Sequence, residues 1–189
     1  MSERRVIHVE DPSALRAIAH PLRLKIIGML RSEGPLTVGT LGERLDAASG
    51  SISYHLATLE RHGFVEKAPE LGRDGRERWW RASADYTTID AMELQGDPAT
   101  REAGLALRRT IVQGYAAETI AYLDGEADLD PEWIEASTQS DDLLWLTADE
   151  LRRLSAELDE VVRRWHDHSD RDREGARPVR AIYSAFLRP

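Results

Sequence analysis

Apolar residues in the first third of the chain recur every three or four positions, the spacing of one helix face. This spacing predicts four helices, which we expect over residues 12–19, 21–33, 38–45 and 49–62. Asp11, Thr37 and Ser49 stand at the expected helix starts, where a side-chain oxygen can accept from the first free backbone N–H groups. In the fourth helix the apolar stripe is expected to face inward; it consists of Ile52, Leu56 and Leu59.

Two runs of strand-like composition follow the fourth helix, at residues 64–67 and 76–81. Asp74-Gly75 lies between them, and this dipeptide favours a tight hairpin turn. Leu36-Thr37 is expected to form a very short strand. Two short helices joined by a tight turn and followed by a hairpin are typical of a winged helix-turn-helix. The pattern therefore predicts a mainly α fold with a small β component, of the α+β class.

The polar side of the fourth helix carries short or hydrogen-bonding side chains. Ser51, Ser53, Tyr54 and Thr58 lie off the apolar stripe, and no acidic residue stands among them. A helix that enters the major groove of DNA needs such side chains, because they bond base edges without repelling phosphates. A solvated surface helix usually carries Glu and Lys instead, so this composition favours DNA binding over the solvated alternative.

The net charge of −9 does not by itself suit a DNA-binding protein, but the charge is unevenly distributed. Residues 1–88 carry 13 basic and 12 acidic side chains, whereas residues 89–189 carry 12 and 22. Phosphate binding depends on local charge. A mildly basic strip between residues 61 and 81 suits either phosphate contact or an ordinary solvated hairpin. It consists of Arg61, Lys67, Arg73, Arg76, Arg78 and Arg81.

Several class-defining features are missing from the sequence. No run approaches the roughly 20 apolar residues that a membrane span requires, and the N-terminus lacks the apolar stretch of a secretion signal. The chain contains no cysteine, which excludes disulfides and thiolate chemistry. We therefore expect a cytoplasmic protein that does not bind membranes.

Four runs resemble the arsenic-repressor (ArsR) family of transcription regulators, in the order and at the spacing of that family. They are His20–Ile27, Leu36–Leu41, Ser51–Leu59 and Gly63–Val65. The resemblance covers roughly residues 12–83. It implies a regulator, expected to be a repressor, that binds an inverted-repeat operator in double-stranded DNA as a homodimer.

The resemblance also implies which residues meet DNA, with the helix from Ser49 to His62 as the recognition helix. His55 fits a family position, yet its spacing from Ile52 equally suits a packing histidine, and both interpretations stay open. The expected DNA-binding residues are Ser49, Ser51, Ser53, Tyr54, His55, Thr58, Arg61, Arg73, Arg76 and Arg78.

The chain departs from the metal-sensing members of that family, which bind ions through cysteines or through His and Asp clusters on a later helix. It has no cysteine to hold arsenite, and residues 98–123 contain no histidine. The one dense group is His166-Asp167-His168, but residues two apart on a helix point about 200° apart. The six histidines are scattered along the chain, and His55 and His62, which share one expected helix, lie two turns or about 10 Å apart, too far for one ion. We therefore predict no metal site and no cofactor, with the effector unknown.

Residues 84–97 are expected to be a connector, followed by a long helix over residues 98–123. Its apolar face is wider than packing against one neighbour requires, which favours a dimerisation helix over an ordinary core helix. The expected dimer contacts are Leu105, Leu107, Ile111, Val112, Tyr115, Ala116 and Ile120. We accordingly divide the chain into a DNA-binding domain, residues 1–88, and a dimerisation and possible regulatory domain, residues 89–189.

The last third is expected to form a small α+β unit. A short helix over residues 131–137 precedes an apolar run, 143–146, which is expected to pair as a strand with residues 178–187. Thr147 and Glu150 form a capping box that opens a further helix with an apolar seam. Its aromatic residues can fill a core or line a small-molecule pocket, and we favour the core; they include Trp133, Trp145 and Trp165.

Two other classes of function were weighed. The chain has no glycine-rich phosphate loop, no serine elbow and no histidine-rich metal motif, so we expect no enzymatic activity. Its acidic C-terminal half is compatible with a protein-interaction adaptor that uses the winged fold without binding DNA. Salt-dependent binding to genomic DNA separates the regulator from the adaptor.

Overall fold

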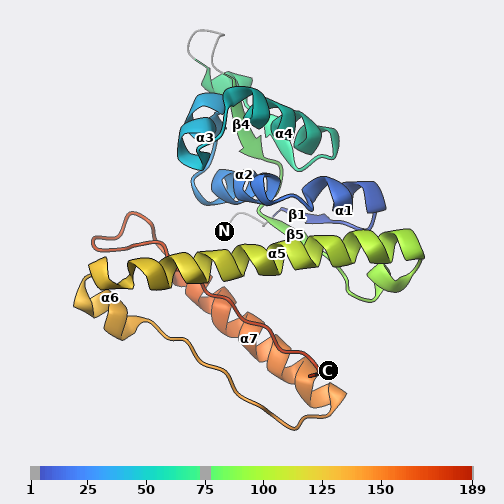
Figure 1. The fold of residues 1–189 in the computed structure, drawn as a ribbon, viewed down its shortest axis with the longest axis vertical. Helices are drawn as coiled ribbons and strands as arrows, with labels where there is room; N and C mark the ends of the chain where they lie inside the picture. The colour runs from blue at the N-terminus through green and yellow to red at the C-terminus, as the bar shows by residue number, and fades with distance from the viewer. Residues whose placement is uncertain (1–4, 73–77, 189) are drawn as a thin grey trace. The chain divides into compact units, whose positions relative to one another are not determined.

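The computed structural model describes residues 5–72 and 78–188 (Figure 1). The chain divides into two compact units, Met1–Leu123 and Asp124–Pro189, which we call the N-terminal and C-terminal units. This division differs from the boundary after residue 88 that the sequence suggested. The reason is that the first half of the long helix contributes Ala103 and Leu107 to the N-terminal core.

The four helices predicted for the N-terminal unit are confirmed. They are α1 (Pro12–Ile18), α2 (Pro21–Ser32), α3 (Val38–Leu45) and α4 (Ser49–Arg61). Asp11 caps α1 by accepting from the backbone N–H of Ala14 at 2.8 Å, and Thr37 caps α3 by accepting from Thr40 at 3.1 Å. The predicted cap at Ser49 is wrong, because Ala48 occupies the cap position and makes no side-chain bond there.

A three-stranded antiparallel sheet has the order β2-β4-β3. Its strands are β2 (Leu36–Thr37), β3 (Val65–Lys67) and β4 (Trp79–Ala82), and the short helix η1 (Pro69–Leu71) follows β3. Val65 pairs with Ala82 and Leu36 pairs with Trp80. The predicted mainly α fold with a small β component, of the α+β class, is therefore confirmed. The predicted turn at Asp74-Gly75 lies outside the described residues.

A second sheet was not predicted. Strand β1 (Val6–His8) pairs in parallel with β5 (Tyr86–Thr88), and η2 (Glu93–Gln95) follows. Residues 84–97 are therefore more than the connector that the sequence suggested. Because the two strands lie 80 positions apart and parallel pairing needs a long crossover, no local pattern announces them.

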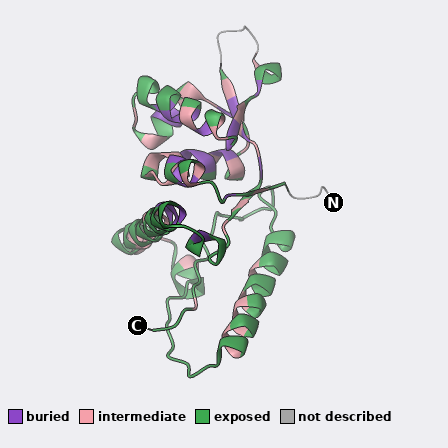
Figure 2. Cartoon of the chain, turned by 90° about the vertical axis from the view of Figure 1, so that its right-hand side faces the viewer, coloured by how far each residue is buried: buried purple, intermediate pink, exposed green. Residues whose placement is uncertain are grey.

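The core of the N-terminal unit collects residues from α1 to α5, as the buried positions in Figure 2 show. Helix α5 (Pro98–Gly125) joins it through Ala103 and Leu107, which lie in the same cluster as Leu94 of η2. A Cβ at Gly104 would stand 2.6 Å from a methyl carbon of Leu94, so the absence of a side chain lets α5 approach that close.

The C-terminal unit is helical. It contains η3 (Glu126–Asp128), α6 (Pro131–Ala136) and α7 (Ala148–His168). The capping box of α7 is confirmed, since Thr147 accepts from the Glu150 N–H while the Glu150 carboxylate accepts from the Thr147 N–H.

The strands expected at residues 143–146 and 178–187 are wrong, since neither run forms a strand in the described part of the unit. Two of the expected core aromatics are also exposed, Trp145 to 93% and Trp165 to 68%. A four-residue leucine-rich run without alternation has no buried face to fix its register, and this explains the failure. In the described part of the chain, none of the helices has both the length and the apolar character that a membrane span requires.

The docking of α5 on the core is testable through Leu107, which is fully buried. Leu107→Ala is expected to lower the free energy of unfolding by about 2–5 kcal/mol, because it removes apolar burial and leaves a cavity. Urea denaturation measures the loss. The neighbouring exposed Arg108, changed to Ala, is the matched control; equal stability of the two variants contradicts the packing described.

Candidate nucleic-acid interface

Helices α3 and α4 form a helix-turn-helix pair with a tight connection. Asp46 ends α3 in the left-handed region, at φ 48°, and Ala47 and Ala48 lead into α4. A Cβ on Gly42 would lie 2.9 Å from the carbonyl oxygen of Ala47, so a larger residue there would push the turn away. This close contact fixes the position of α4 against α3.

Helix α4 separates its residues sharply by burial. Ile52, Leu56 and Leu59 are fully buried, whereas Ser51, Ser53 and Tyr54 are exposed, Tyr54 to 68%. The structure therefore leaves all three of these predicted DNA-binding residues accessible, spread over the broad surface of the helix that faces away from the buried stripe. Ser49 is also exposed, at its first position. Thr58 is half-buried, and its hydroxyl donates to the Tyr54 carbonyl at 3.0 Å.

His55 belongs to the packing rather than to the polar face. It is 8% exposed, and its ring lies 4.5 Å from that of His20 between centroids. This position disfavours the expected contact between His55 and DNA, because little of its side chain is accessible. The alternative weighed from the sequence, a packing histidine, describes its position.

His20 and Arg23 were not singled out as site residues. His20 caps α2, its Nδ1 accepting from the Leu22 N–H at 3.2 Å. Burial lowers the pKa of His20 and of His55, and the nearby Arg23 charge lowers both further. Burial also lowers the pKa of the Arg23 guanidinium, while the nearby Tyr54 phenol opposes that shift. A cation that the sequence did not assign thus stands beside the exposed face of α4.

The basic strip is partly compensated by acids. Lys67 pairs with Glu60 at 2.9 Å, and Arg81 pairs with Glu66 at 2.6 Å and with Glu70 at 2.5 Å. These two cations are therefore engaged by acids of α4, β3 and η1.

Arg61 and Arg78 are exposed, and neither forms an ion pair within the described ranges. The other two predicted wing contacts, Arg73 and Arg76, lie outside the described residues. The strip therefore offers fewer uncompensated charges than its sequence suggests.

The dimer contacts expected on α5 divide between two sides. Leu107 is wrong as a dimer contact, because it is buried in the core, and Ile111 packs partly against the same core. The remaining residues are exposed; they are Leu105, Val112, Tyr115, Ala116 and Ile120. At about 100° per residue, all of these except Tyr115 fall within about 80° of one another, opposite Leu107. We call these four the α5 stripe: Leu105, Val112, Ala116 and Ile120.

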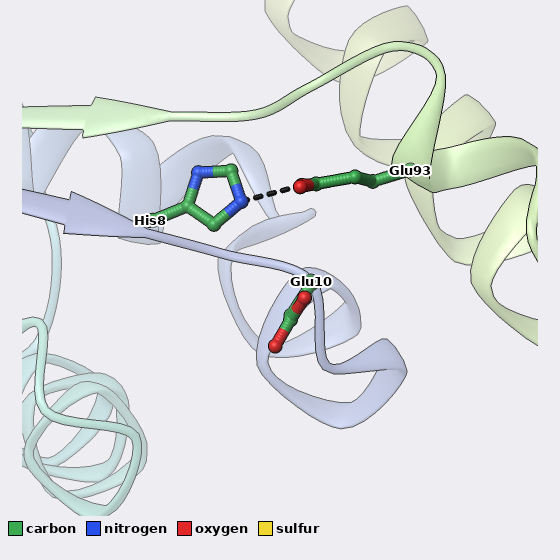
Figure 3. Close-up of side chains that lie close together, drawn as sticks. All are labelled: His8, Glu10 and Glu93. Atoms are coloured by element: carbon green, nitrogen blue, oxygen red, sulfur yellow. Dashed lines mark hydrogen bonds and ion pairs between the residues drawn. The ribbon is translucent and has the colours of Figure 1, made fainter.

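The sequence suggested that no histidine lies in a group of potential metal ligands, but His8 does. His8 of β1 lies beside Glu10 and Glu93, and one potential ligand atom from each lies within 4.8 Å of the others (Figure 3). His8 Nε2 is 2.5 Å from a Glu93 carboxylate oxygen. Spacing along the chain could not reveal this group, because Glu93 is 85 residues from His8.

A sequence profile described as a helix-turn-helix domain matches residues 18–68. Over 56 residues the chain is 41% identical to the transcriptional activator HlyU of Vibrio cholerae, an alignment that spans 30% of this chain and 51% of that protein. The chain thus spans about half the length of this curated relative.

Two solved structures show similarity to the chain. Reduced HlyU from Vibrio cholerae shares 26% identity, with a TM-score of 0.33, over 51% of this chain and 83% of that one. The transcriptional regulator homologue from Pyrococcus horikoshii shares 21%, with a TM-score of 0.32, over 52% and 87%. The sequence matches identify residues 18–68 as a helix-turn-helix domain.

The neighbouring histidines His20 and His55, whose rings are tilted by 44° against each other, make stability depend on pH. Both pKa values are lowered in the folded state, so the unfolded chain binds protons more readily. Their contribution to stability is complete above the ordinary histidine pKa of about 6.5 and is lost as pH falls toward the folded-state values. In urea denaturation, His55→Phe is expected to reduce this loss. An unchanged pH profile in the variant would contradict burial as its cause.

Proposed function

We propose that this protein is a DNA-binding transcription regulator whose helix α4 enters the major groove. The observation that carries the proposal is the division of α4 into a fully buried stripe and exposed polar residues, Ser51, Ser53 and Tyr54, with no acidic residue among them. A recognition helix needs both, since the stripe holds it on the domain while the polar face bonds base edges. The helix-turn-helix match and the relative named as a transcriptional activator support this proposal.

Each polar side chain receives a role from its chemistry and position. Ser51, Ser53 and Tyr54 contact base edges or phosphates, because their hydroxyls both donate and accept. Ser49 and Thr58 flank them on the same helix. Arg61 and Arg78 contact phosphates from the end of α4 and the start of β4, and Arg73 and Arg76 are proposed to add phosphate contacts.

We further propose that the regulator acts as a homodimer through the α5 stripe. A two-fold dimer presents two copies of α4 to half-sites about one helical turn apart, which requires an inverted-repeat operator. We also propose that the protein belongs to the ArsR family and that it represses transcription. The similar HlyU protein, by contrast, is named an activator. A reporter gene placed behind the bound operator measures the direction of regulation.

The recognition face is tested by changing Ser53 and Tyr54 together to alanine. Each good base contact contributes about 1–3 kcal/mol of discrimination, so operator affinity is expected to fall tenfold or more while the fold persists. Titration by fluorescence anisotropy, on a duplex that the wild-type chain selects from genomic fragments, measures the loss. The matched control is Ser32→Ala with Tyr86→Ala, two residues outside α3 and α4.

Unchanged operator affinity in the variant that lacks Ser53 and Tyr54 would contradict the assignment of α4 as the recognition helix. The same titration distinguishes the proposed regulator from a protein-interaction adaptor, because the adaptor does not bind genomic DNA. For the regulator, the wild-type affinity is expected to fall steeply with added salt, because phosphate contacts release counterions.

The α5 stripe is tested by Ala116→Glu. Burying a carboxylate without a partner is costly, so a dimer that depends on this stripe is expected to dissociate and to lose affinity for the inverted repeat. Sedimentation equilibrium measures the mass. The control is Ala117→Glu, which adds the same charge at an exposed position about 100° around the helix. A monomeric wild type, or a dimeric Ala116→Glu variant, contradicts the proposed interface.

A further inference from the structure

His8, Glu10 and Glu93 come from three different segments of the N-terminal unit. His8 ends β1, Glu10 lies just before the cap of α1, and Glu93 opens η2. All three side chains are exposed, and potential ligand atoms from the three lie within 4.8 Å of one another. Figure 3 shows the His8 ring directed at Glu93, with Glu10 on the adjoining turn of chain.

The backbone positions each group independently of the others. Val9 is buried, and its N–H donates to the Thr88 carbonyl at 3.1 Å, which extends the pairing with β5 beyond His8. In an extended segment alternate residues share a side, so His8 and Glu10 both point away from the core.

Glu93 is held in a comparable way. The Asp90 carboxylate accepts from the N–H groups of Met92 and Glu93, at 2.6 and 3.3 Å, and so fixes the turn that begins η2. Leu94 is buried beside it. The carboxylate of Glu93 is therefore presented outward from an anchored turn.

The geometry points to a binding site for a divalent transition-metal ion, of which Zn²⁺ is the test case, formed by His8, Glu10 and Glu93. One imidazole nitrogen and two carboxylate oxygens are ligands that Zn²⁺ uses, with a water completing the tetrahedron. Two carboxylates balance the charge of the ion. Small side-chain movements suffice for binding, because ligand atoms bound at about 2 Å lie within roughly 4 Å of one another.

A second group orients the histidine. The His8 Nδ1 lies 3.2 Å from the Thr88 hydroxyl of β5. With Zn²⁺ on Nε2, the Nδ1–H donates to this hydroxyl, the arrangement that fixes the ring of metal-bound histidines. Thr88 is thus a positioning residue, distinct from the three ligands.

The ion would join parts of the chain that are distant in sequence. His8 and Glu10 precede the helices of the DNA-binding domain, whereas Glu93 stands just before α5, whose first turn is capped by Asp97. Zinc binding therefore connects the N-terminal strand to the segment that leads into the α5 stripe. This site goes beyond the proposed function and does not depend on DNA binding.

Zinc titration by calorimetry tests the site on the full-length, untagged chain after chelator treatment. We expect one equivalent of Zn²⁺ to bind and to raise the thermal midpoint, because the ion binds the folded state. His8→Gln and Glu93→Gln are expected to weaken binding at least tenfold, and Thr88→Val about 10–100-fold, the usual cost of losing an outer partner.

The control is the double variant His166→Gln with His168→Gln, which removes the other dense histidine group and is expected to bind like the wild type. Retained affinity in both His8→Gln and Glu93→Gln overturns the site. So does a loss of binding in the His166 and His168 control. An absence of zinc binding by the wild type at micromolar concentration also overturns it. Each readout is independent of DNA, so a failure of this site is distinguishable from a failure of the proposed function.

Discussion

The surface that the helix-turn-helix presents to solvent depends on how α4 is held. Ile52, Leu56 and Leu59 are fully buried against the surrounding helices, and full burial of each such side chain contributes about 1.5–3 kcal/mol. This fixes the rotation of α4 about its axis, and the rotation decides which side chains reach solvent. The exposed face with Ser53 and Tyr54 is thus a consequence of the buried one.

Helix α5 has one side that packs on the N-terminal core and an opposite side that is exposed. On one side Ala103, Gly104 and Leu107 close against η2 and the N-terminal core. On the other side the α5 stripe stays exposed, which suits a second copy of the chain. Because the same helix is anchored in the domain that carries α4, pairing through the stripe would hold two recognition helices at a fixed separation.

Charge in the N-terminal unit is arranged locally rather than in bulk. Lys67 and Arg81 are engaged by acids of α4, β3 and η1, while Arg61 and Arg78 remain exposed. Near α4, burial lowers the pKa values of His20 and His55, and the guanidinium of Arg23 lies close enough to Tyr54 to interact with its phenol. Arg61 and Arg78 therefore carry positive charge with which no acid of the described residues forms an ion pair.

The sequence by itself determined the features that depend on near neighbours: the four N-terminal helices, the caps at Asp11 and Thr37, the capping box of α7 and the polar face of α4. It failed where distant segments decide the outcome. Three features show this: the pairing of β1 with β5, the burial of His55 on His20 and of Leu107 in the core, and the contact of His8 with Glu93. Each joins residues that lie too far apart in the chain for a local sequence pattern to reveal. Only the tertiary structure brings such partners together, because burial and long-range pairing are properties of the packed chain.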